Sequence, residues 1–177
     1  RFIPLNTLTL ADRKALVPEY ADQEDLKRLV KMSKAVKTQK FSKPRYVGDP
    51  INAIRIFNEK EVDELALIDI ERSKRGLPPN LELVERVASE CFMPLSYGGG
   101  IRTVDDTKRL FSVGVEKVIV QGAALRSVDI VSEIADFSGS QSVTVAVDIR
   151  RDKFGKLHLY DSASGRELAR DWQAFIK

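Results

Sequence analysis

Four short segments of this sequence carry residues suited to proton transfer and phosphate binding, and each follows an apolar run. They are Asp69, the turn Gly98-Gly99-Gly100, the segment Gln121-Gly122-Ala123, and Asp148. A glycine-rich turn between a strand and a helix can direct backbone N–H groups at an anion, because no Cβ blocks the approach. Two carboxylates beside such a turn suit general acid–base chemistry. An acid at a strand end can equally cap the following turn, so the recurrence at successive strand ends is what predicts a site for a phosphorylated ligand.

The elements that would position these segments alternate between strands and helices. Strands that are apolar throughout are buried on both faces, which is typical of a parallel sheet. Repeated strand–helix units predict an α/β fold, either an open doubly wound sheet or a (β/α)8 barrel. In both folds the active site lies at the carboxyl ends of the strands, where the four segments would meet. The expected strands cover residues 35–41, 65–70, 92–97, 117–121 and 142–148.

Capping residues predict the ends of several helices. Asp49 before a proline is a typical helix start, and so is Thr103 three residues before Asp106, where Asp replaces the usual Glu of a capping box. Glycine commonly ends a helix because it adopts the left-handed conformation freely. The remaining expectations are helix ends at Gly114 and near Gly139, a hairpin over residues 150–160 and a helix over residues 167–177.

Length and composition favour one ordinary globular domain. The chain has 177 residues with one cysteine and one histidine. These two residues, Cys91 and His158, are too few for an internal disulfide or a Cys-based zinc site, and a single histidine disfavours a His-based metal site and a Ser-His-Asp triad. We therefore expect no metal, no cofactor and a reducing, cytoplasmic location. No apolar run is long enough to span a membrane. His158 stands in an alternating run, where a solvent-facing strand residue is the favoured interpretation over a catalytic one.

Positive charge is concentrated in one block. The net charge is +3, yet residues 26–48 hold eight of the 29 bases and no acid, so the rest of the chain is net acidic. Such a block fits a nucleic acid, a membrane surface or a phosphorylated small molecule, but it also fits a solvated helix face. The latter interpretation is favoured, and nucleic-acid binding is disfavoured because only Phe41 and Tyr46 supply aromatic rings within the block.

Six motifs stand in order along most of the chain, at residues 46–53, 62–69, 91–102, 114–118, 139–143 and 147–148. Together they resemble the cyclase subunit of imidazole glycerol phosphate synthase. The resemblance implies a (β/α)8 barrel of which this chain, as one partial barrel over residues 1–177, holds about the first five βα units. It also implies a lyase or cyclase of histidine biosynthesis. Such an enzyme takes ammonia from a glutaminase partner and acts on a phosphorylated aminoimidazole-ribulose precursor.

The same resemblance implies roles for individual residues. Asp148 matches the general acid/base, Lys37 matches a lysine in the loop after strand one, and Asp69 lies at the mouth of the site. Gly98, Gly99 and Gly100 match one phosphate site. Gln121-Gly122-Ala123 stands where the family usually has Asn-Thr-Ala, so that half of the phosphate site is altered. The charged residues expected where ammonia enters, at the amino-terminal end of the barrel, are Arg1, Glu64 and Lys117.

Three departures from the family pattern keep alternatives open. The residues Leu5-Asn6-Thr7-Leu8 hold no acid where the first catalytic aspartate should lie, residues 9–35 form an extra helical insertion after strand one, and strands six to eight are absent. Because it lacks this acid, the sequence more closely resembles a paralogous branch of the family, whose members amidate sugars for bacterial surface polysaccharides such as lipopolysaccharide. A truncated, non-catalytic scaffold is the other alternative.

Overall fold

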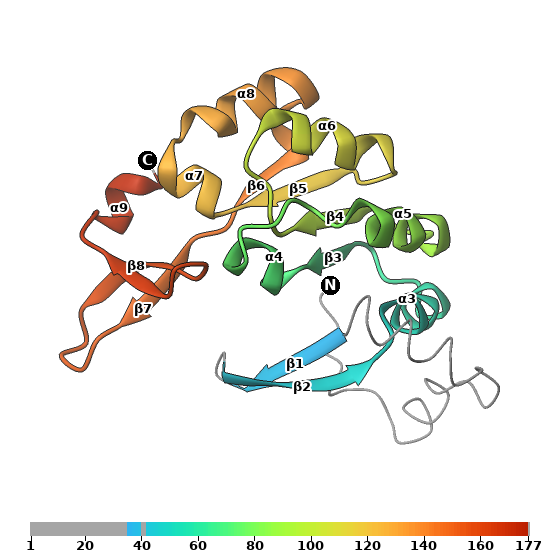
Figure 1. The fold of residues 1–177 in the computed structure, drawn as a ribbon, viewed down its shortest axis with the longest axis horizontal. Coiled ribbons are helices and arrows are strands. Elements are labelled where there is room, and N and C mark those ends of the chain that lie inside the picture. Colours follow the sequence, from blue (N-terminus) through green and yellow to red (C-terminus); the bar gives the residue numbers. More distant parts are fainter. Residues whose placement is uncertain (1–34, 40–41, 177) are drawn as a thin grey trace. The chain divides into compact units, whose positions relative to one another are not determined.

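The computed structural model describes residues 35–39 and 42–176 (Figure 1). Arg1, the segment Leu5-Asn6-Thr7-Leu8 and all but the last residue of the predicted insertion over residues 9–35 lie outside the described residues. The chain divides into two compact units, residues 1–65 with 82–94 and residues 66–81 with 95–177. No described helix has the length and apolar composition needed to cross a membrane.

In its described residues, the first unit contains a β-hairpin and two helices. These are β1 (Ala35–Gln39), β2 (Ser42–Gly48), α3 (Pro50–Glu59) and α5 (Leu81–Glu90). The predicted start of α3 is confirmed, because the Asp49 side chain accepts a hydrogen bond from Ile51 N at 2.8 Å and Pro50 stands in the first turn. The Asn58 side chain ties the two helices together by donating to Glu90 O at 2.6 Å. Apolar residues at helical spacing are buried on both helices: Ile54, Leu83, Val84 and Val87.

A four-stranded sheet is the core of the second unit, although its first strand begins in the first. It consists of β3 (Leu65–Ile68), β4 (Leu95–Gly98), β5 (Lys117–Val120) and β6 (Val143–Val145), in that order. The pairs β4–β5 and β5–β6 are parallel. Leu65 N donates to Pro94 O and Asp69 N to Gly98 O, so β3 also runs parallel to β4. The predicted α/β fold with a parallel sheet is thereby confirmed.

Helices follow the strands of this sheet. They are α4 (Ile70–Lys74), α6 (Val104–Ser112), α7 (Gly122–Arg126) and α8 (Asp129–Ser138). The predicted capping box is present: Thr103 Oγ1 accepts from Asp106 N, and the Asp106 carboxylate accepts from Thr103 N. α6 and α8 lie together beside β5 and β6 (Figure 1). Leu110 and Ile134 are fully buried on these two helices, which places the core between them and the sheet.

A small antiparallel sheet follows the parallel one. It consists of β7 (Asp148–Arg151), β8 (Leu157–Asp161) and β9 (Arg166–Leu168), and α9 (Trp172–Phe175) comes after it. The predicted hairpin is confirmed, with Arg150 opposite His158. Its turn is fixed by Asp152, whose Oδ1 accepts from Phe154 N at 2.8 Å and Lys156 N at 2.9 Å.

Two sequence predictions about this end of the chain are wrong. The strand expected over residues 142–148 ends at Val145, because residue 148 already pairs in the antiparallel sheet. The helix expected over residues 167–177 is limited to Trp172–Phe175, because Glu167 and Leu168 pair with β8 as β9. In both places tertiary pairing outweighs local propensity. The short helices α4 and α7 were not predicted, since five residues carry too little periodicity.

Candidate functional site

Three of the four predicted segments lie in a row at the carboxyl edge of the parallel sheet, and the fourth, Asp148, follows at the start of β7. Asp69 directly follows β3, and its N–H donates to Gly98 O of β4 at 2.7 Å. Gln121 directly follows β5, and its Nε2 donates to Tyr160 O at 3.5 Å. Tyr160 is the cross-strand partner of Asp148. These contacts join Asp69 to the glycine turn, and Gln121 to the strand that pairs with Asp148.

Close packing explains the glycines of the turn. A Cβ at Gly98 would lie 3.1 Å from side-chain atoms of Ile119 and Ile68. Gly99 has φ +132°, and a Cβ there would overlap the carbonyl oxygen of Asp69. Gly100 has φ +74°, and a Cβ there would overlap the carbonyl oxygen of Leu77. The turn therefore needs glycine to fit between neighbouring chain segments as well as for its backbone conformation.

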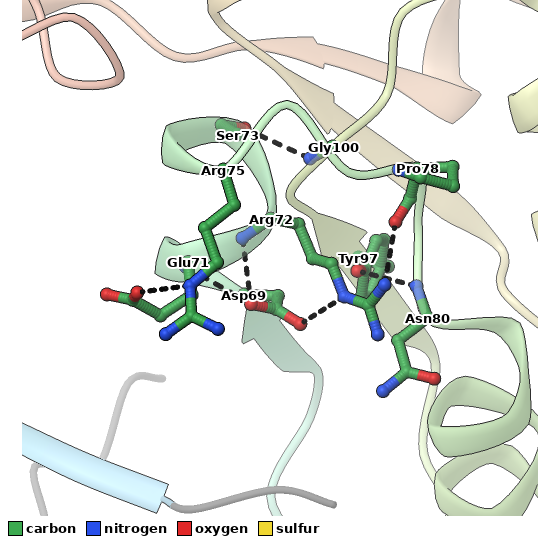
Figure 2. A network of polar contacts seen from close by, with 9 residues as sticks. All are labelled: Asp69, Glu71, Arg72, Ser73, Arg75, Pro78, Asn80, Tyr97 and Gly100. Carbon is green, nitrogen blue, oxygen red and sulfur yellow. Dashed lines mark hydrogen bonds and ion pairs between the residues drawn. The ribbon is translucent and has the colours of Figure 1, made fainter.

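Asp69 is the N-cap of α4 (Figure 2). Its Oδ1 accepts from Glu71 N at 3.2 Å and from Arg72 N at 3.3 Å. Its Oδ2 lies 3.6 Å from Arg72 Nε, and both side chains are largely buried, 20% and 25% exposed. Of the two interpretations left open by the sequence, the structure therefore shows capping, and no proton-transfer role follows from its contacts.

Tyr97, one residue before the turn, is buried beside this ion pair, and no role for it was predicted from the sequence. Its hydroxyl oxygen accepts from Asn80 N at 3.5 Å (Figure 2). Burial raises its pKa to about 12, the negative charge of Asp69 adds to the rise, and the Asn80 N–H and the Arg72 charge oppose it. The signal available in the sequence was a large aromatic residue directly before three glycines. The hydroxyl stays protonated at neutral pH and fixes the chain ahead of α5.

The segment after β5 begins the short helix α7. Gln121 precedes the helix and Gly122 is its first residue, while Ala123 and Ala124 are buried. An Nη1 atom of Arg126 lies 3.5 Å from the place where a Cβ of Gly122 would stand. A guanidinium group therefore folds back along the first turn of α7, a cation that the sequence analysis did not identify.

Asp148 occupies the first position of β7 and not the end of a parallel strand. Its Oδ2 accepts a hydrogen bond from Ser162 Oγ. Its cross-strand partner Tyr160 carries the guanidinium of Arg150 5.3 Å from the ring centroid. Asp148 is half-buried, so a carboxylate with one hydroxyl partner is accessible at the end of the row.

The remaining predicted site residues lie elsewhere. Lys117 opens β5, at the amino-terminal edge of the sheet, and Glu64 stands one residue before β3. Lys37 lies inside β1, opposite Arg45 of β2, in a hairpin strand and not in an open loop. The described residues include no group of three or more His, Cys, Asp or Glu that could hold a metal ion.

His158 lies in β8 as expected, but its side chain does not simply face solvent. Its Nε2 lies 3.0 Å from Asp152 Oδ2, and both side chains are 25% exposed. The hydrogen bond from His158 is the main cause that lowers the pKa of Asp152. Desolvation opposes it, and the hydrogen bonds from the Lys156 and Phe154 amides lower the pKa further. The pair thus belongs to the hairpin turn and not to the row of strand ends.

Comparison with known proteins gives consistent matches. A family profile described as histidine biosynthesis protein matches residues 28–174. A Pseudomonas aeruginosa protein provisionally named imidazole glycerol phosphate synthase subunit hisF2 is 51% identical over 142 residues, 80% of this chain and 57% of that protein. A Leptospira borgpetersenii protein, provisionally named subunit HisF, is 54% identical over 116 residues, 66% of this chain and 46% of its own length.

A more distant relative carries the enzyme's name without qualification. The Streptococcus gordonii imidazole glycerol phosphate synthase subunit HisF is 39% identical over 147 residues, 81% of this chain and 58% of that protein. The chain therefore spans about half the length of the curated relatives it matches.

Proposed function

We infer that this chain, which belongs to the histidine biosynthesis protein family, supplies part of an ammonia-using synthase of the imidazole glycerol phosphate synthase cyclase type. The family has the (β/α)8 barrel fold, and the parallel sheet with its following helices fits a part of such a barrel. The observation that carries the proposal is the row of strand-end segments, because active sites of this fold are built at the carboxyl ends of the strands.

The row divides into a phosphate-binding part and a proton-transfer part. The turn Gly98-Gly99-Gly100 and the start of α7, with Gln121, Gly122 and Ala123, would hold a phosphate of the substrate. Gly122 leaves room for an anion near Arg126, whose guanidinium is suited to phosphate. Asp148 would move protons, since its carboxylate is accessible and Ser162 orients it.

Ammonia would come from a glutamine-hydrolysing partner at the opposite edge of the sheet. Lys117 opens β5 at that edge, and Glu64 and Arg1 are proposed to act with it. A carboxylate and two cations can bind a polar partner surface and a small polar molecule at the amino-terminal ends of the strands. In this proposal, ammonia reaches the strand-end row from the amino-terminal edge of the sheet, and the phosphorylated substrate binds at the carboxyl edge.

Replacement of the accessible carboxylate tests the proposal. In the protein made from its complete reading frame, with ammonium and the aminoimidazole-ribulose phosphate precursor, Asp148→Asn is expected to reduce turnover at least about 100-fold. Asp136→Asn on the exposed surface of α8 is the matched control and should leave turnover unchanged. Turnover by Asp148→Asn at the control rate would overturn the role of Asp148 and, with it, the proposed chemistry.

A second candidate, amidation of a sugar for surface polysaccharides, is favoured by specific residues. Leu5-Asn6-Thr7-Leu8 lacks the expected acid, and Gln121-Gly122 replaces the usual Asn-Thr. The Pseudomonas aeruginosa and Leptospira borgpetersenii proteins, which have provisional names, are also more similar to this chain than the Streptococcus gordonii enzyme is. Incubation with ammonium and either acceptor separates the candidates: consumption of a sugar acceptor but not of the imidazole precursor identifies the amidating branch, and consumption of neither supports a scaffold.

A further inference from the structure

We propose that Ser73 is a phosphate-positioning residue of the glycine turn. Its hydroxyl accepts the Gly100 N–H and would donate its own proton to a phosphomonoester oxygen. The inference rests on the proposed function, which brings a phosphorylated substrate to this turn. It adds a residue from the segment after β3 that no motif identified.

The geometry of the Ser73–Gly100 contact leads to this role. Gly100 N lies 3.0 Å from Ser73 Oγ (Figure 2). Gly100 is buried and Ser73 is exposed. The backbone of Leu77 and Pro78 closes the side of Gly100 on which a Cβ would stand. An anion arriving from solvent therefore reaches the Ser73 hydroxyl more readily than the Gly100 amide behind it.

The hydroxyl has the capacity for both bonds. A serine hydroxyl offers one donor and two acceptor positions, and the Gly100 amide uses one acceptor. The O–H proton remains for a ligand oxygen. A hydroxyl that already accepts a hydrogen bond is polarised and donates more strongly, and donation to a charged phosphate is stronger than donation to a neutral group.

Ser73 is held in place by contacts on both sides of it. Asp69 caps the start of α4, and Gly76 N donates to Ser73 O at 3.2 Å. Arg72 Nη1 donates to Pro78 O at 3.3 Å, which joins α4 to the loop that follows it. The Tyr97 hydroxyl then fixes the far end of that loop through Asn80 N. A hydroxyl on such a framework is preorganised, so little conformational freedom is lost when a ligand binds.

The charges around Ser73 favour an anion. Its neighbours Arg72, Lys74 and Arg75 are basic. Arg72 forms an ion pair with Asp69, and Arg75 forms one with Glu71 at 3.2 Å. The second pair is exposed and therefore weak, so a phosphate can take the place of the Glu71 carboxylate beside Arg75. Lys74 takes part in none of the ion pairs found among the described residues. Its exposed ammonium adds long-range attraction for phosphate.

Titration with inorganic phosphate tests the inference in the full-length protein. The probe is the ¹⁵N–¹H resonance of Gly100, which should shift on phosphate binding in the wild type. Ser73→Ala is expected to weaken phosphate binding about 10-fold, whereas Ser73→Thr keeps the hydroxyl and should bind within about twofold of wild type. Ser89→Ala removes an exposed helical hydroxyl of α5 and is the matched control.

Three results would overturn the inference. They are phosphate binding by Ser73→Ala that is as tight as in the wild type or tighter, loss of phosphate binding in Ser73→Thr, and no phosphate-dependent shift of the Gly100 resonance in the wild type. Ammonia-dependent turnover of the same preparations separates this inference from the proposed function. Turnover that needs Asp148 while Ser73→Ala binds phosphate normally refutes only the role of Ser73. Phosphate binding that needs Ser73 without any turnover leaves the role of Ser73 standing and refutes the proposed synthase.

Discussion

The two ends of the strand-end row are built in different ways. At the glycine turn, Gly99 and Gly100 fit against the backbone of neighbouring segments. The Tyr97 side chain and the Asp69–Arg72 ion pair next to the turn are largely buried. In the hairpin beyond Asp148, the turn is held by local bonds to Asp152, Gly155 has open space around it, and Phe154 is 83% exposed. The comparison indicates that the glycine turn, which is the proposed phosphate-binding part, is preformed by packing, whereas the segment that carries Asp148 depends on local turns.

The largest expected effect comes from adding a methyl group at the two kinds of turn. Gly99→Ala should lower the free energy of unfolding by about 3 kcal/mol or more, because the Cβ overlaps the Asp69 carbonyl and the backbone is left-handed. Gly155→Ala should cost only about 1 kcal/mol, since its φ of +86° is unfavourable but nothing lies within 4 Å of the new atom. Chemical denaturation of both variants measures the difference. Equal losses would show that packing does not distinguish the two regions.

The next effect concerns alkaline pH and the buried hydroxyl of Tyr97. Its folded-state pKa of about 12 is above the ordinary value of 10.0, so the unfolded chain loses the proton first. Stability from this group is fully present below pH 10 and is lost as pH rises toward 12, by on the order of 1.4 kcal/mol per pH unit. Denaturation midpoints across this interval should fall for the wild type and fall less for Tyr97→Phe. Identical slopes for the two proteins would remove the buried-tyrosine explanation.

The smallest effect is expected in the hairpin. The pKa of Asp152 is lowered by His158 and two turn amides, so its contribution is present above the ordinary carboxyl range and is lost as pH falls through the lowered pKa. Asp152→Ala should speed hydrogen exchange of the Phe154 and Lys156 amides, and Asp152→Asn should do so less, since an amide oxygen can still accept their bonds. The Gly100 region should be unaffected. Loss of protection there as well would show that the two regions open together.

The sequence predicts the parallel sheet because its strands are apolar throughout, and it predicts the starts of α3 and α6 because caps are local devices. Thr103 and Asp106 satisfy each other within one turn, so nothing distant can alter them. The position of Asp148 could not be predicted in the same way. Whether residue 148 ends one strand or begins another depends on the pairing partner Tyr160, twelve residues away.

The candidate site was likewise only partly accessible from the sequence. The glycines and Asp69 mark strand ends by their residue types, and the structure connects them through the Asp69–Gly98 bond. The contributions of Arg72, Ser73 and Tyr97 depend on the path of a loop between α4 and α5. No spacing rule relates Ser73 to Gly100, which lies 27 residues further along. The roles of Asp148, Lys37 and the amino-terminal charged residues stay predictions.

The bonds between the segment after β3 and the glycine turn run in both directions. The Asp69 N–H donates a hydrogen bond to Gly98 O, and the Gly100 N–H donates one to Ser73 Oγ. Neither segment can lift away without breaking both bonds, so the two should open as one cooperative unit with a shared lifetime. A ligand bound to the exposed Ser73 hydroxyl would favour the state in which both bonds are closed, so its binding should slow the hydrogen exchange of the Asp69 and Gly100 amides together.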